Sequence, residues 1–561
     1  MPRQTRLLWV CPGVICLFLL WLIARAPVMV AAGHAAGHDP DAACASCHRS
    51  IYARYEKTPM AHASGTAAEG FLPADFEHAN SGVHYRITEE DGKVWLSYER
   101  DALTRGAVGA LRGRQELRYF LGSGLRGRTY LFEQHGYWFE APINWYAKKR
   151  VWDMAPNFQT TREMPLTLPV DPGCLHCHAS GAASPLEDAR NRYAGEPFAA
   201  GGITCEACHG DASAHVGSGG KTPMLRVDEL EANRRDSVCL NCHLEGQVGV
   251  DRLGKRIENF KPGDELSDYT LFFTYKTENG SGGRATSQWE ALLKSACKKK
   301  SGDKLTCTSC HDPHGSPAPE ERVAFYRQRC LACHNGAGFA AGHHAENPDC
   351  TECHMARPPS NDIAHEQVTD HWIRKRVSQE RLPLATSGEL VTVGGGTASD
   401  RDLGLAYAQM AVRGDESAGM RAVEFLRRAE KSDPEAAKDS GLHAQLGFLE
   451  QVDGKTDEAA EEYRLALDAD PQNALAAGDL ALIEAKRHRA EEALRLWRTV
   501  DEHDPTQVAA AMNMAVVECA LGEKDAALET LERTLEFSPD ETAAKDFAEQ
   551  IRSGKRSCGV R

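Results

Sequence analysis

Seven short cysteine motifs constrain the fold of this 561-residue chain more than any other feature. Fourteen of its 19 cysteines form Cys-x-x-Cys pairs, and a histidine directly follows each pair. Two thiols at this spacing add across the vinyl groups of a haem, and the next imidazole reaches the iron. We therefore predict seven covalently attached haem c groups. The predicted attachment cysteines are Cys44, Cys47, Cys174, Cys177, Cys205, Cys208, Cys239, Cys242, Cys307, Cys310, Cys330, Cys333, Cys350 and Cys353. The predicted proximal iron ligands are His48, His178, His209, His243, His311, His334 and His354.

Structural zinc is the alternative interpretation of Cys-x-x-Cys pairs. Zinc-binding pairs combine two by two, whereas the number of pairs here is odd. Zinc also gives no reason for a histidine after every pair. A redox-active Cys-x-x-Cys pair needs a thioredoxin-like context, which seven copies do not fit. The motifs therefore favour haem over zinc or thiol chemistry.

Each six-coordinate iron needs a second axial ligand, whose identity sets the reduction potential. Met60 and His62 both follow the first motif; Met60 would raise the potential, and His62 would make a bis-histidine site. His215 is close enough to the third motif to reach a neighbouring iron. Pro313 fixes a turn that directs His314 away from its own haem. The other distal candidates are His78, His343, His344, His365 and His371. Spacing along the sequence does not assign these ligands to particular irons.

The N-terminal segment predicts export. Arg3 and Arg6 precede an apolar run over residues 7–24, and small residues follow at 30–33. We expect residues 1–32 to be a signal peptide, with an uncleaved N-terminal membrane anchor as the alternative. Haem is attached to such motifs outside the cytoplasm. We therefore expect the protein in the periplasm or otherwise exported.

Residues 39–375 are expected to form a multihaem cytochrome c domain. Alternating and aromatic-rich segments, with a hairpin signal at Asp91-Gly92, predict a β-rich insert at about 83–160. Six motifs lie within 174–354, which leaves about 30 residues per haem, too few for an apolar core. The haems are therefore expected to form the core, and their close spacing favours electron hopping.

The C-terminal part of the chain predicts a different architecture. Glycine-rich residues 376–400 are expected to be a linker. In residues 401–555, prolines recur with spacings of 37, 34 and 34, at Pro434, Pro471, Pro505 and Pro539. A 34-residue period is typical of tetratricopeptide repeats, each a pair of antiparallel helices. The predicted fold class is therefore mostly α: a haem-cored domain with a small antiparallel β insert, then an α-solenoid.

Charge and the remaining cysteines limit the partners. The net charge is −15, of which residues 401–561 contribute −12, so a nucleic acid is excluded as a partner. The acidic segment is either a solvated face or a surface for a basic protein. Cys297 and Cys519 are expected to be buried thiols, and Cys558, in a basic tail, could pair with another chain after export.

Several phrases resemble bacterial multihaem cytochrome c proteins with C-terminal tetratricopeptide repeats. They include Tyr52-x-x-Tyr55-x-x-Thr58-Pro59-Met60, Leu121-Gly122-Ser123-Gly124 and Leu305 through His314. Such proteins are related to the tetrahaem cytochrome c of ammonia oxidisers and, more remotely, to hydroxylamine oxidoreductase and pentahaem nitrite reductase. The resemblance implies periplasmic electron transfer. The chain departs from the enzymes because it has no Cys-x-x-Cys-Lys motif and seven rather than eight haem motifs.

Two functions follow from these patterns. The first is an electron-transfer protein rather than an enzyme, whose repeats dock redox partner proteins or a membrane electron-transfer complex. The alternative is a multihaem reductase or oxidase of a small nitrogen or sulfur compound at one five-coordinate haem. That site needs cationic groups, which Arg126, Arg128 and residues 148–150 could supply.

Overall fold

The computed structural model describes residues 41–559 except for 102–108, 157, 165–167, 188, 277–284, 337–338, 340–342, 344–346, 358–367 and 376–382. The predicted signal peptide at 1–32 and the distal candidates His344 and His365 lie outside the described residues. The described residues belong to one unit, Asp39–Arg561.

Among the described residues, nine strands form one antiparallel sheet in the order β2-β3-β4-β5-β6-β7-β8, with β1 paired to β5 and β9 paired to β7. The strands are β1 Ser64–Thr66, β2 Ala74–His78, β3 Val83–Glu90, β4 Lys93–Arg100, β5 Leu111–Leu121, β6 Gly127–Gln134, β7 Tyr137–Tyr146, β8 Val151–Met154 and β9 Leu168–Pro169. The turn between β3 and β4 is Asp91-Gly92, and both residues have positive φ, as a tight hairpin requires. The sheet extends beyond the predicted insert at both ends.

The fifth motif begins in a 3-10 helix, Cys307–Ser309, and short α-helices hold or flank the other motifs. They are α2 Ala42–Ala45, α3 Arg49–Tyr55, α4 Pro172–His178, α5 Glu206–His209, α6 Ser213–Gly217, α7 Ala232–His243, α8 Gln288–Lys294, α9 Ala296–Ser301, α10 Arg322–Leu331 and α12 Cys350–His354. Asp171 caps α4 by accepting from the amide of Gly173 at 2.8 Å, and Pro172 pre-sets the first helical turn. Asp349 caps α12 in the same way. Helices this short are marginal alone and depend on tertiary contacts.

Two smaller sheets accompany these helices. Strands β10 Ala179–Ala182 and β11 Phe198–Gly201 pair with each other. Strands β12 Val248–Asp251, β13 Thr270–Tyr275 and β14 Leu390–Val393 form a three-stranded antiparallel sheet. The segment predicted as a linker, 376–400, therefore contains an ordered strand with Leu390 and Val393 buried.

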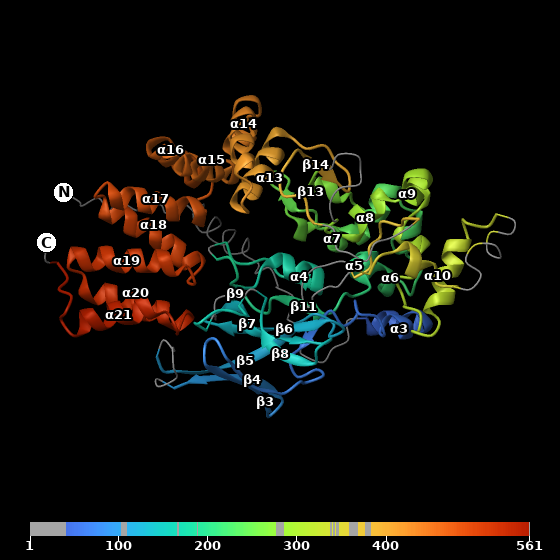
Figure 1. The fold of residues 1–561 in the computed structure, drawn as a ribbon, viewed down its shortest axis with the longest axis horizontal. Helices are drawn as coiled ribbons and strands as arrows, with labels where there is room; N and C mark the ends of the chain where they lie inside the picture. The colour runs from blue at the N-terminus through green and yellow to red at the C-terminus, as the bar shows by residue number, and fades with distance from the viewer. Residues whose placement is uncertain are drawn as a thin grey trace, which may run out of the picture. The chain divides into compact units, whose positions relative to one another are not determined.

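Helices α13 to α21 are stacked one after another in antiparallel pairs (Figure 1). They are α13 Asp400–Val412, α14 Glu416–Ser432, α15 Ser440–Val452, α16 Thr456–Ala469, α17 Ala474–Lys486, α18 Ala490–His503, α19 Val508–Leu521, α20 Lys524–Phe537 and α21 Thr542–Arg552. A Cβ on Gly447 would lie 2.7 Å from the ring of Tyr463, so the close approach of α15 and α16 requires glycine. Among the residues that the structure describes, none of the helices combines the length and hydrophobicity needed to span a bilayer.

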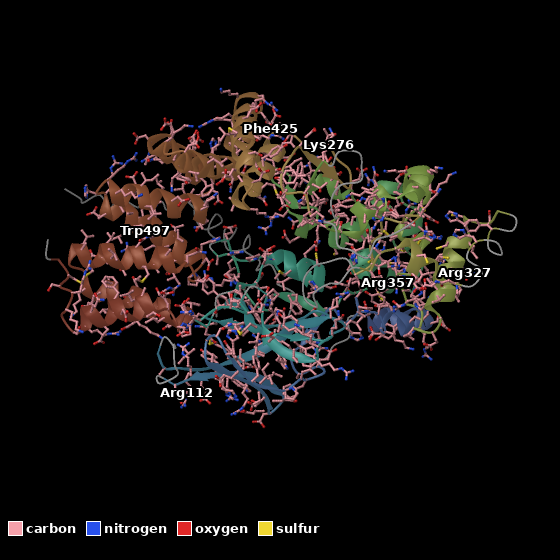
Figure 2. The ribbon with its side chains drawn as sticks, viewed as in Figure 1. Arg112, Lys276, Arg327, Arg357, Phe425 and Trp497 are labelled. Atoms are coloured by element: carbon pink, nitrogen blue, oxygen red, sulfur yellow. A yellow bond between two sulfur atoms is a disulfide. The ribbon has the colours of Figure 1, made fainter. Side chains whose placement is uncertain are left out.

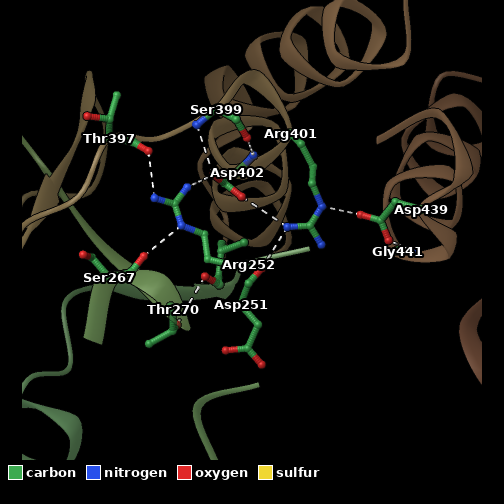
Figure 3. Close-up of polar contacts among 12 residues, drawn as sticks. Asp251, Arg252, Ser267, Thr270, Thr397, Ser399, Arg401, Asp402, Asp439 and Gly441 are labelled. Carbon is green, nitrogen blue, oxygen red and sulfur yellow. Dashed lines mark hydrogen bonds and ion pairs between the residues drawn. The ribbon is translucent and has the colours of Figure 1, made fainter. Parts of the chain in front are cut away.

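The first repeat begins on the three-stranded sheet (Figure 3). Arg252, just after β12, pairs with Asp402 of α13 at 2.6 Å and donates to the carbonyls of Ser267 and Thr397. Arg401 donates to the carbonyl of Asp251 at 2.8 Å. This polar junction fixes α13 against the sheet.

Cys519 and Cys558 form a disulfide, with their Cα atoms 4.5 Å apart. The expectations of a buried free thiol at Cys519 and of an intermolecular bond at Cys558 are therefore wrong. The physical reason is that the C-terminal tail turns back onto α19, where the amide of Gly559 donates to the carbonyl of Cys519 at 2.8 Å.

Candidate haem attachment sites

The cysteine motifs share one local geometry. In the first, third, fifth and sixth motifs, the amide of the histidine donates to the carbonyl of the first cysteine at 2.8–3.0 Å. This bond closes one helical turn, which brings the two thiols and the imidazole to adjacent positions. The second, fourth and seventh motifs lie at the ends of α4, α7 and α12, where the helix supplies the same turn.

Four motif histidines face a second histidine, and each pair of rings has a similar separation. The pairs and their centroid distances are His48–His215 at 6.2 Å, His209–His314 at 6.0 Å, His311–His371 at 6.2 Å and His354–His343 at 6.0 Å. An imidazole nitrogen lies about 2 Å from a bound transition metal and about 1.1 Å from its ring centroid, so two imidazoles on opposite sides of one iron have centroids about 6 Å apart. The observed separations fit an iron between the rings.

Hydrogen bonds at the second ring nitrogen support the same arrangement. His209 Nδ1 lies 3.1 Å from the carbonyl of Leu225, and His354 Nδ1 lies 2.6 Å from that of Arg374. Two distal candidates do the same: Nδ1 of His215 and of His371 lie 2.6 Å and 2.9 Å from the carbonyls of Thr222 and Thr369. A carbonyl only accepts, so Nδ1 carries the proton and Nε2 keeps its lone pair for a metal.

Burial favours the neutral imidazole that metal binding requires. Burial lowers the pKa of His311, and the neighbouring His371 and His243 lower it further. Burial also lowers the pKa of His314, with a smaller effect from His209. The pKa of His243 is lowered by burial as well.

The other distal candidates have different surroundings. His62 Nε2 lies 2.6 Å from the carbonyl of Glu56, on the chain segment that follows the first motif. His78 is buried, with Nδ1 2.8 Å from Ser81 Oγ and Nε2 3.0 Å from the carbonyl of Gln159. Met60, two residues before His62, contacts the segment that precedes the third motif. Its backbone carbonyl accepts from the amide of Ile203 at 2.9 Å. His48 faces His215 instead of His62 in the described structure.

The segment that holds the last three motifs lacks a core of its own. Among the described residues of 295–375, Ala356 is the only hydrophobic residue that is buried. Arg327 and Arg357, labelled in Figure 2, belong to this segment. A polypeptide cannot hold this many short helices together without buried apolar surface. The segment therefore fits an apolar group that fills the space between its helices, as porphyrin rings would.

Cysteines of different motifs lie close together. The sulfurs of Cys44 and Cys205 and a carboxylate oxygen of Asp41 all lie within 4.8 Å of one another. The same carboxylate accepts from the amide of Cys205. The second and fourth motifs also adjoin, because the sulfurs of Cys177 and Cys242 each lie 4.0 Å from a carbonyl of the other motif. The motifs are therefore neighbours in space in an order different from their order in the sequence.

The sequence predicts histidines as iron ligands, but it does not predict the groups that orient them. The carbonyls of Thr222, Leu225 and Arg374 belong to the backbone, so no residue type marks them. Asp41 was also missed, because it precedes α2 without capping it and its carboxylate instead accepts from the amide of Cys205, which is distant in the sequence.

Three family models match parts of this chain. The model described as cytochrome c554 and c-prime matches residues 144–210. The model described as a doubled CXXCH motif matches residues 300–339. The tetratricopeptide repeat model matches residues 484–551.

The chain is also similar to individual proteins. It is 24% identical over 187 residues to the multiheme cytochrome MtrA of Shewanella baltica (strain OS185), which is 29% of this chain and 51% of that protein. It therefore matches about half the length of this relative. A crystal structure of MamA is 19% identical, covering 28% of this chain and 86% of that chain, with a TM-score of 0.24. A tetratricopeptide repeat protein from Parabacteroides merdae ATCC 43184 is 20% identical, covering 28% and 61%, with a TM-score of 0.25. The sequence thus combines multihaem cytochrome c motifs, which imply covalently bound haem c, with tetratricopeptide repeats.

Proposed function

We propose that this protein is an exported electron carrier with seven covalently bound haem c groups, one at each Cys-x-x-Cys-His motif. When bound, haem iron supplies reversible one-electron chemistry at a potential set by its axial ligands. The chain's own residues hold the groups, exclude water and fix the ligands. The relation to the tetrahaem cytochrome c of ammonia oxidisers is part of this proposal.

The ring geometry supports an assignment of four distal ligands. His215 serves the first motif, His314 the third, His371 the fifth and His343 the seventh. The observation that carries the assignment is the 6.0–6.2 Å separation of the four ring pairs. Bis-histidine ligation gives six-coordinate, low-spin, low-potential iron, which suits electron transfer better than substrate binding.

The compartment and partners follow from the same chemistry. The disulfide between Cys519 and Cys558 fits an oxidising compartment, as expected for a periplasmic or otherwise exported protein. The partners are redox proteins, with the tetratricopeptide repeats as a protein-binding region. Weak, transient docking is typical of such encounters.

The test is mass spectrometry and spin-state spectroscopy of the protein purified from the periplasm. Seven haems per chain, with at least four low-spin bis-histidine signals in electron paramagnetic resonance, support the proposal. Fewer haems would refute the stoichiometry. A dominant high-spin ferric signal that changes on adding nitrite or hydroxylamine would favour the reductase or oxidase instead.

A further inference from the structure

The tetratricopeptide array contacts the rest of the chain at both of its ends. At the N-terminal end, α13 and α14 share one apolar cluster with the three-stranded sheet. Phe273 of β13 and Tyr407 of α13 are both buried in it. The hydroxyl of Tyr275 donates to Asp415 at 2.5 Å, and the amide of Leu390 donates to the hydroxyl of Tyr407 at 2.8 Å. The first repeat and this sheet therefore form one packed body.

At the C-terminal end, a fully buried ion pair joins the array to the large sheet. Arg100 of β4 and Asp540, between α20 and α21, have side chains that are 0% and 1% exposed. Their two hydrogen bonds measure 2.5 Å and 2.9 Å. The amide of Met164 donates to the same carboxylate at 2.9 Å. A charge buried this completely is tolerated only with its partner in place, so the pair fixes the loop on the sheet.

Further contacts come from the same end of the array. Phe537 is buried in the core of the large sheet, with its ring centroid 5.8 Å from that of Tyr137. The hydroxyl of Tyr137 donates to the carbonyl of Glu502 at 2.6 Å, and the amide of Arg190 donates to that of His503 at 3.0 Å. The C-terminal ends of α18 and α20 therefore both contact the large sheet.

The second and fourth haem motifs are attached to these two sheets separately. Leu175 of the second motif is buried with Leu131 and Trp138 of the large sheet. Leu240 of the fourth motif is buried with Val393 of the three-stranded sheet. The two motifs also contact each other directly, because α4 adjoins α7 and residues 257–259, and the sulfurs of Cys177 and Cys242 each lie 4.0 Å from a carbonyl of the other motif. The spacing of the motifs therefore depends both on this direct contact and on what holds the two sheets together.

We propose that the tetratricopeptide array is an internal brace: its two ends bind the two sheets and thereby hold the second and fourth haem motifs at the separation at which α4 and α7 contact each other. This inference rests on the proposed function, because it assumes that both motifs bind haem. Stacked repeats transmit a fixed span from the first helix to the last, since each repeat packs on its neighbours. Arg100 and Asp540 are then positioning residues for the two haems.

The test compares Asp540→Asn with a matched control in the full haem-loaded chain. The control is Glu532→Gln, which removes a carboxylate of the same repeat from an exposed pair with Arg552. In Asp540→Asn, we expect seven haems and unchanged motif ligands, but amide exchange in α4 and α21 on the order of a hundredfold faster. We also expect an altered spin–spin interaction and altered midpoint potentials for two haems. The control should match the wild type in every measurement.

Tyr137→Phe is the second variant, in case Asp540→Asn does not fold. It removes one hydrogen bond of the same junction, so exchange in α4 should be about fivefold faster. Faster exchange confined to α21, with α4 and the two potentials unchanged, would overturn the brace. Mass spectra that show no haem at the second or fourth motif would refute the proposed function instead, and exchange at α4 and α7 would still test the brace.

Discussion

Replacing Cys558 with serine removes the disulfide to Cys519, and the loop it closes sets the expected cost. The two cysteines are 39 residues apart, and this loop contains α20 and α21. Loop-closure entropy for this length corresponds to about 4 kcal/mol at 25 °C. Because stacked repeats contact only their neighbours, the loss should fall mainly on the last repeats.

The assay is urea unfolding monitored by amide hydrogen exchange, which reports on each helix separately, with and without a reductant. Cys558→Ser should lower the free energy of unfolding of α20 and α21 by about 4 kcal/mol and remove its dependence on the reductant. Cys297→Ser is the matched control, since Cys297 lies outside both the disulfide and the haem motifs. Equal stability of Cys558→Ser and the wild type would refute the reasoning, and so would a reducible dimer on a denaturing gel.

Three further predictions concern ligation, pH and haem-dependent folding. His314→Met should keep seven haems and raise the potential of one of them by on the order of 0.1 V in a spectroelectrochemical titration, whereas the control His84→Met should change no potential. Burial opposes protonation of His443, but its hydrogen bond to Glu462 raises its pKa overall. The stability that this pair contributes is therefore complete below about pH 6.5 and is lost as the pH rises through the raised pKa of His443. Thermal melts of His443→Gln should lack this dependence between pH 6 and 8, and an unchanged slope would assign it elsewhere. Haem-free chain should keep slow amide exchange in α15–α18 and lose it in α10 and α12, because residues 295–375 lack a buried apolar core among the described residues; protection of α10 without haem would contradict this.

Features encoded locally were predictable from the sequence, and features that join distant segments were not. The Asp91-Gly92 hairpin and the helical repeats follow from turn chemistry and a 34-residue period, both of which act over short distances. The partners of the motif histidines depend on tertiary packing: His48 and His215 are 167 positions apart in the chain but 6.2 Å apart in space. The proline before His314 predicted that its ring points away from its own motif. In the structure the ring faces His209, a partner that nothing local to His314 identifies.

The predicted linker shows the same limit. Its glycines obscured Leu390–Val393, whose pairing with β13 is visible only in the folded chain. Likewise, nothing in the basic sequence around Cys558 predicts that the C-terminal tail packs against α19.

The topology of the three-stranded sheet determines when this sheet can be completed during folding. Strands β12 and β13 precede the last three haem motifs, whereas β14, which completes the sheet, follows all of them. The sheet is therefore incomplete until the chain that follows the last motif has folded. Once β14 pairs with β13, α13 packs on the completed sheet, so the first repeat and the sheet depend on each other for their buried surface.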